Sequence, residues 1–263
     1  MSASLSLVAG LMAVSLLAGL TKGVTGFGGA LVMAPLFGLA LPSSQAAALI
    51  VLVNCAASLQ GWRGWVRQAH WPTVLPLAAI ALACTAAGVR LIASGSLPDM
   101  HRLIGLCVLA VTALHVLGWR WRHGGGATPT LAAGAVSGLM TALCGIGGVA
   151  AVYYFNGIRR AETGAIPQAA DHGQAHEQAH EQAALLRANL LAYFMVLFFG
   201  AAMILAWDGQ VGLPQLALTA WLVPAFAAGV LVGERLYGLL SPSWFQRIVS
   251  ALLFCAGLVA LAG

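Results

Sequence analysis

The chain has 263 residues, of which 60% are hydrophobic and only 7% are charged, and its mean hydropathy is +0.91. Because a soluble domain has about 25% charged residues, this composition excludes an ordinary soluble enzyme or binding module. The net charge of +5 is spread over short loops and is not clustered, which argues against a nucleic-acid partner. The five cysteines lie at scattered apolar positions and predict no disulfide framework.

Long stretches of the chain contain no charged residue, at 23–62, 124–158, 188–207 and 209–233. A membrane-spanning helix needs about 20 such residues, so we expect an all-α polytopic protein in the lipid bilayer of the cell inner (plasma) membrane. Eight hydrophobic stretches predict eight to ten helical segments, at 3–40, 44–62, 72–93, 101–118, 128–157, 185–206, 213–236 and 243–262. The first is interpreted as a retained helix and not as a signal peptide, because no basic residue precedes its apolar part.

A glycine-rich motif occurs in the first hydrophobic stretch and again in the fifth. Four glycine pairs share an offset of 119, namely Gly19/Gly138, Gly26/Gly145, Gly28/Gly147 and Gly29/Gly148. The pattern predicts two homologous membrane repeats, residues 1–123 and 124–263, each starting with a broken or re-entrant glycine-rich helix. Paired interruptions of this kind indicate a transporter binding site. Basic loops, placed in the cytoplasm by the positive-inside rule, favour inverted repeats over parallel ones.

The glycine motifs and the polar residues near them are the predicted substrate site. A broken helix inside a membrane presents backbone N–H groups that can bind an anion. Lys22 is the only charged residue before position 63 and could pair with that anion. The alternatives are close helix packing for the glycines and a lysine that reaches the membrane surface.

Asn54 and Asn189 are amides inside apolar stretches, and each could bind a substrate oxygen or link two helices. The predicted substrate-binding residues are therefore Thr21, Lys22, Thr25, Gly26, Gly28, Gly29, Asn54, Thr141, Cys144, Gly145, Gly147, Gly148 and Asn189.

The segment 161–184 is a polar insertion in the second repeat, with a tandem Ala-His-Glu-Gln repeat. We expect a solvated, mobile loop that can contain a short helix. His176-Glu177-Gln178-Ala179-His180 matches the H-E-x-x-H zinc pattern, and His172 adds an imidazole one turn earlier. The match arises from a tandem duplication in a polar segment, so we predict no metal site and no cofactor.

The motifs resemble those of the TauE/SafE family of sulfite-exporter-like membrane permeases. The resemblance lies in Gly26-Phe27-Gly28-Gly29 followed by Ala34-Pro35-Leu36, and in Gly145-Ile146-Gly147-Gly148. Leu41-Pro42, Arg67 and His70-Trp71 also fit, as does Arg187-Ala188-Asn189-Leu190 in the second half. The resemblance implies transport of a small anion such as sulfite, a sulfonate or a related organic acid.

We therefore expect a secondary transporter, an exporter and not an enzyme, that is coupled to an ion gradient. Protons are the expected coupling ion, with Lys22 as a candidate carrier. The alternatives are an anion channel of the same fold, a membrane metalloenzyme that uses the histidine segment, and an assembly protein without transport. The small anion and the lipid bilayer are the expected partners, and a homo-oligomer is left open.

Overall fold

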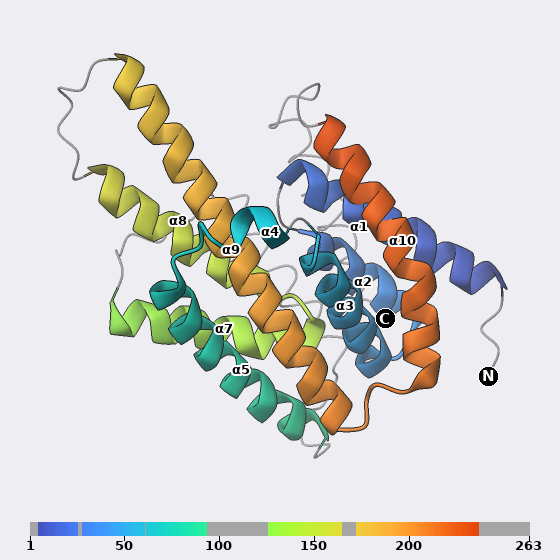
Figure 1. Ribbon diagram of the computed structural model, residues 1–263. Helices are drawn as coiled ribbons and strands as arrows, with labels where there is room; N and C mark the ends of the chain where they lie inside the picture. The colour runs from blue at the N-terminus through green and yellow to red at the C-terminus, as the bar shows by residue number, and fades with distance from the viewer. Residues whose placement is uncertain (1–4, 26–27, 61, 94–125, 165–171, 237–263) are drawn as a thin grey trace.

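The computed structural model describes residues 5–25, 28–60, 62–93, 126–164 and 172–236, and every regular element in these ranges is a helix (Figure 1). The helices are α1 (Leu5–Thr25), α2 (Gly29–Ala40), α3 (Ser43–Ser58), α4 (Trp62–Trp65), α5 (Trp71–Ala93), α7 (Ala127–Cys144), α8 (Gly148–Gly164), α9 (His172–Trp207) and α10 (Leu213–Leu236). Two of the predicted stretches, 101–118 and 243–262, lie outside the described residues.

Five helices in the described ranges are long and apolar enough to cross a membrane, namely α1, α5, α7, α10 and the part of α9 from Ala184 onward. The apolar helices α2 and α3 have 12 and 16 residues. At about 1.5 Å per residue, both are shorter than the hydrocarbon core of about 30 Å. In the described ranges the membrane protein is therefore all-helical, with helices of spanning length beside two shorter apolar ones.

Each glycine motif interrupts a helix. In the first motif α1 ends at Thr25 and α2 begins at Gly29, and in the second α7 ends at Cys144 and α8 begins at Gly148. Gly28 has φ of 98° and Gly145 has φ of 69°, in the left-handed region that residues with a side chain rarely adopt. The predicted breaks are therefore present in both motifs, and glycine is what allows the chain to turn there.

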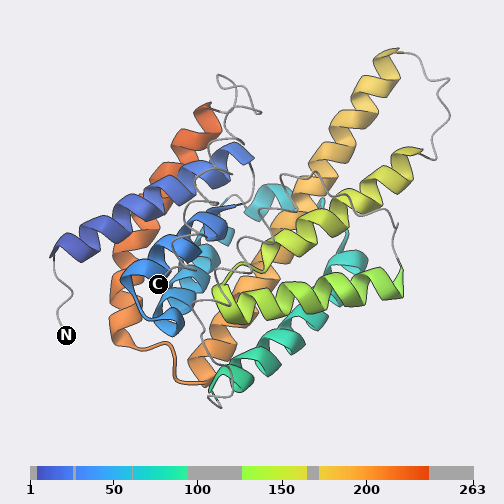
Figure 2. The ribbon, with the colours of Figure 1, turned by 180° about the vertical axis from the view of Figure 1, so that it is seen from behind.

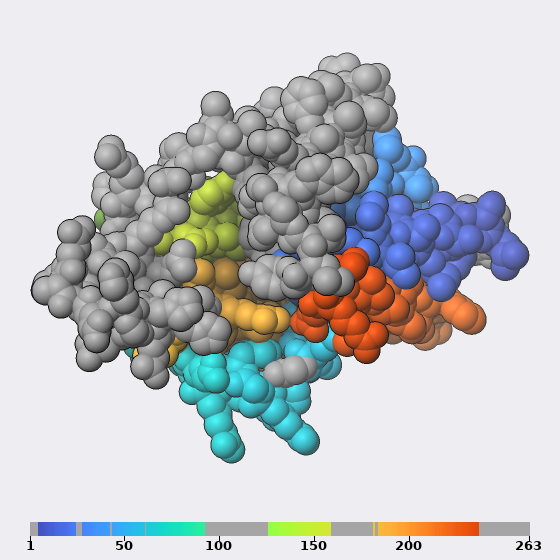
Figure 3. Space-filling view, turned by 90° about the horizontal axis from the view of Figure 1, so that it is seen from above, coloured from blue at the N-terminus to red at the C-terminus, as the bar shows by residue number. Residues whose placement is uncertain are grey.

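The first glycine of each motif has a different role, because it lies inside a helix and lets another helix approach. A Cβ atom on Gly19 would collide with the backbone carbonyl of Phe226 in α10, and one on Gly138 would collide with that of Ala81 in α5. Figures 1 and 3 show α1 and α10 side by side. The alternative interpretation of close helix packing thus applies to these two positions.

The helices of the two predicted repeats are interleaved. Helix α1 packs against α10 of the other half, and α7 packs in the same way against α5. The central helices α3 and α9 contact each other, and α3 also contacts α10 whereas α9 contacts α5 (Figures 1 and 2). If α1, α3 and α5 of the first half correspond to α7, α9 and α10 of the second, the α1–α10 contact corresponds to the α7–α5 contact. The α3–α10 contact then corresponds to the α9–α5 contact.

The predicted polar loop at 161–184 is instead largely helical. Helix α8 continues to Gly164 and α9 begins at His172, so 172–184 belongs to a long helix and not to a loop with a short helix of its own. The segment is rich in Ala, Glu and Gln, which have high helix propensity, and this explains the difference. Figures 1 and 2 show the end of α8 and the start of α9 projecting together from the body. The side chains of His172, His176 and His180 lie outside the described residues.

Two clusters of buried apolar side chains stabilise the body. One lies around α5, α8 and α9 and includes Leu77, Phe155 and Phe194. The other lies around α1, α2, α3 and α10 and includes Phe37 and Phe226. Residues of both clusters meet at the glycine turns, where the candidate site lies.

Candidate functional site

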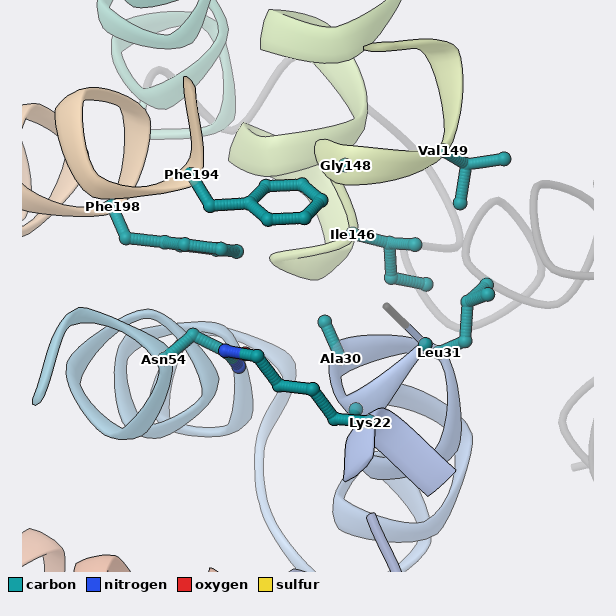
Figure 4. Close-up of a pocket in the computed structure, with 11 residues that line it drawn as sticks. Lys22, Ala30, Leu31, Asn54, Ile146, Gly148, Val149, Phe194 and Phe198 are labelled. Carbon is teal, nitrogen blue, oxygen red and sulfur yellow. The ribbon is translucent and has the colours of Figure 1, made fainter. Parts of the chain in front are cut away.

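A small cavity lies between the two glycine turns and is partly open to solvent. It is lined by Lys22, Gly28, Gly29, Ala30, Leu31, Asn54, Ile146, Gly148, Val149, Phe194 and Phe198. Figure 4 shows that the first half of the chain forms one side of the cavity and the second half forms the other.

Lys22 is the only lysine in the chain, and its side chain lies in this cavity. It belongs to the last turn of α1, and it is only 9% exposed. Its Nζ atom lies 5.6 Å from the centroid of the Phe226 ring, a cation–π contact that compensates part of its lost hydration. No carboxylate of the described residues forms an ion pair with it. Lys22 therefore offers a positive charge to an anion in the cavity.

Asn54 contributes an amide from α3 on the same side of the cavity. Its side chain is buried, and one Nδ2–H group donates a hydrogen bond to the Ile50 carbonyl at 2.9 Å. The Lys22 side chain extends toward it in Figure 4. An amide has a second N–H group and an oxygen, so Asn54 can still bind a ligand beside the ammonium group.

Two helices begin at the cavity. The lining includes Gly29, Ala30 and Leu31 from the start of α2, and Gly148 and Val149 from the start of α8. The first backbone N–H groups of a helix have no acceptor within it, and the helix dipole places partial positive charge there. Both helix starts therefore add to the preference for an anion that Lys22 creates.

The opposite side of the cavity is apolar. Phe194 and Phe198, one turn apart on α9, have ring centroids 6.0 Å apart and an interplanar angle of 34°. The Phe194 ring packs on Gly148, where a Cβ atom would lie 2.8 Å from Cζ of the ring. Sequence reasoning missed both aromatic residues, because nothing in an apolar helix distinguishes a ring that faces a cavity from one that faces lipid.

A network of buried hydroxyl groups contacts the second glycine turn. The Ser137 hydroxyl contacts both the Gly147 carbonyl and the Tyr193 hydroxyl, and Thr141 Oγ1 donates to the Ser137 carbonyl at 2.8 Å. A Cβ atom on Gly147 would collide with Thr141 Oγ1. These groups therefore fix the shape of the turn that starts α8.

The structure brings together five of the predicted site residues at the cavity, namely Lys22, Gly28, Gly29, Asn54 and Gly148. Others are buried close to the turns but do not line the cavity, namely Thr21, Thr141, Cys144, Gly145 and Gly147. Gly26 and the side chain of Thr25 lie outside the described residues.

Asn189 is placed apart from the other predicted residues. Its Oδ1 atom accepts a hydrogen bond from the backbone N–H of His70 at 2.6 Å, just before α5 begins. This bond ties α9 to the start of α5 and corresponds to the helix-linking role that the sequence left open.

These features define a polytopic helical membrane protein with a buried cation at an internal cavity between two interrupted helices. Residues 11–166 match the family model of the sulfite exporter TauE/SafE. The chain therefore belongs to the TauE/SafE sulfite exporter family, as its motifs predicted. The matched segment contains both glycine motifs, whereas α9 and α10 lie beyond it. No curated protein and no solved structure matches the chain.

Proposed function

We propose that the chain is a secondary transporter of a small anion and that the cavity between the glycine turns is its substrate site. The observation that carries this proposal is the position of Lys22, a buried cation without an anionic partner among the described residues, where two helices begin. A charge inside a membrane protein is costly and is typical of a substrate or ion pathway. An anion in the cavity would balance this charge.

The exchange of contacts between the two halves supports the interpretation as two repeats, 1–123 and 124–263. The α1–α10 and α7–α5 pairs are what an internal two-fold axis would produce, and so are the α3–α10 and α9–α5 pairs. In transporters built from repeats, the substrate site lies at the repeat interface, and one bundle moves against the other around it. Residues of both halves line the cavity, which supports this proposal.

Family membership supports sulfite, a sulfonate or a related organic acid as the substrate and export as the direction. A secondary transporter uses an ion gradient, and protons are the coupling ion that we propose. The protein would act in the inner (plasma) membrane. Anion binding in the cavity does not depend on which ion drives transport, so the substrate site and the coupling ion are tested in separate experiments.

The test is anion flux into liposomes that contain purified wild-type, Lys22→Ala or Lys22→Gln protein. Removal of the charge is expected to raise the apparent KM for sulfite or a sulfonate at least about tenfold, which corresponds to about 1.4 kcal/mol of lost binding. Thermal stability should stay near the wild-type value, because Lys22 has no described ion pair to lose.

Arg67→Gln is the matched control, since it removes one positive charge from an exposed position outside the cavity. It is expected to leave KM unchanged. Wild-type flux from Lys22→Ala would show that the cavity does not bind the anion through this residue and would overturn the proposed site.

A further inference from the structure

The ring of Phe226 contacts Lys22 from outside the cavity. Phe226 belongs to α10 in the second half of the chain, is only 1% exposed and is not one of the described lining residues. The Nζ atom of Lys22 lies 5.6 Å from the centroid of its ring, within the distance at which the face of a ring attracts a cation. A residue of α10 therefore acts on the charge that α1 carries into the cavity.

Two glycines fix the position of Phe226. A Cβ atom on Gly19 would collide with the Phe226 carbonyl, and a Cβ atom on Gly29 would lie 2.8 Å from Cζ of the Phe226 ring. The backbone and the ring thus occupy space that side chains on α1 and α2 would otherwise need. Phe226 cannot shift toward either helix, and its ring contacts both Lys22 and the first residue of α2.

The Lys22 ammonium group has few other partners to hold it at the cavity. No carboxylate of the described residues forms an ion pair with it, and Asn54 is the only other polar side chain of the described lining. A lysine near a helix end can extend to the membrane surface, where water hydrates its charge. The face of the Phe226 ring attracts the ammonium group where water is excluded, so it opposes this movement.

We infer that Phe226 is a positioning residue of the anion site, because its ring holds the Lys22 ammonium group at the cavity. This inference rests on the proposed function and adds a residue of α10, a helix beyond the segment that the family model matches. An ammonium group that is already held in place loses little further freedom when the anion binds. The contact therefore lowers KM and leaves the maximal rate of transport unchanged.

The test replaces Phe226 in the full-length protein with mono-, di- and trifluorophenylalanine. Fluorine withdraws electrons from the face of the ring and weakens its attraction for a cation, whereas the ring nearly keeps its shape. Sulfite flux into liposomes gives KM and the maximal rate. KM is expected to rise with each fluorine, by about tenfold for the trifluoro ring, which corresponds to about 1.4 kcal/mol. The Tm of the purified protein without an anion, which reports the contact itself, should fall in the same order.

Two controls separate this role from apolar packing. Phe37 is fully buried in the same apolar cluster, and no cation of the described residues lies over its ring. The same fluorinated series at Phe37 should leave KM unchanged. In the Lys22→Gln protein, fluorination of Phe226 should change neither KM nor Tm, because no ammonium group remains for the ring to attract. A purely structural role of the ring would not depend on Lys22.

The outcomes distinguish this inference from the proposed function. A constant KM across the Phe226 series, or the same rise in the Lys22→Gln protein, would overturn the inference and leave Lys22 as the anion-binding residue. A fall in Tm without a rise in KM would also overturn it, since the contact would then stabilise the protein without positioning the charge. Wild-type flux from Lys22→Gln would overturn the proposed site as well. A stepwise rise in KM that requires Lys22 and is absent from the Phe37 series supports both.

Discussion

A single lysine in a 263-residue membrane chain lies at the one place where two interrupted helices and an amide meet in the described structure. Burial of Lys22 removes the water that would hydrate its charge, and the described surroundings replace that water only with Asn54 and the Phe226 ring. Neither group neutralises a charge. The proposed substrate anion would supply the missing half of an ion pair with Lys22.

At the same scale, Ser137 determines how firmly the second glycine turn is held. Ser137→Ala would leave the Gly147 carbonyl and the Tyr193 hydroxyl without this partner in a fully buried environment. The expected loss is about 1–3 kcal/mol of stability, seen as a lower Tm of the purified protein. Anion affinity should also fall, because Gly148 at the start of α8 lines the cavity.

Tyr193→Phe, combined with Ser137→Ala, tests whether the two hydroxyls act together. Because they contact each other, the double variant should be less destabilised than the sum of the single variants. Thr219→Ala is the control, since its hydroxyl only donates to the Gln215 carbonyl within α10. Strictly additive effects would contradict a shared network.

Among the elements, the contact between α1 and α10 depends on glycines in both helices. Gly229 and Gly233 of α10 face the backbone of α1 at Leu16 and Leu20, just as Gly19 faces the backbone of α10. A backbone carbonyl cannot move aside as a flexible side chain can. The pair therefore tolerates no side chain at these positions without a shift of one helix.

Gly19→Ala is expected to destabilise the protein by about 1–3 kcal/mol through overpacking. Gly10→Ala lies in the same helix, and nothing lies within 4 Å of the Cβ atom it would add. This second change should be neutral or stabilise the protein by about 0.5–1 kcal/mol, because alanine favours a helix. Comparison of the two melting temperatures checks the prediction, and similar Tm values for both variants would contradict it.

The end of α8 and the start of α9 project from the body of the protein (Figures 1 and 2). The part of α9 that is long and apolar enough to span a membrane begins at Ala184, and the preceding helical turns lie outside this apolar part. Replacement of residues 165–182 with a short Gly/Ser linker should leave the Tm and the anion flux within experimental error of wild type. Loss of flux at normal expression would show that this segment takes part in transport.

For the whole molecule, residues from both halves of the chain line the cavity, as the proposed carrier with two repeats requires. Because a substrate held by Lys22 must be released before the next one binds, carrier transport is expected to saturate and to be stimulated by substrate on the opposite side. An imposed proton gradient should drive accumulation beyond the electrochemical equilibrium of the anion. Flux that only follows the membrane potential, without saturation, would identify a channel of the same fold and contradict this prediction.

The sequence by itself determined the membrane class, the positions of both helix breaks, and Lys22 and Asn54 as residues of the cavity. Hydropathy and glycine spacing are local properties, and a charge or an amide in an apolar segment is conspicuous without any knowledge of its neighbours. The same local reasoning failed for 172–184, where polarity was interpreted as a loop although the residues favour a helix.

Only the tertiary structure decided which faces of the apolar helices meet. It placed Phe194 and Phe198 at the cavity, and it joined Asn189 to His70 instead. In a membrane protein the lipid-facing and the protein-facing sides of a helix are both apolar, so periodicity does not show which side points inward. The orientation of α9, and with it the apolar side of the cavity, is fixed by packing against α3, α5 and α8.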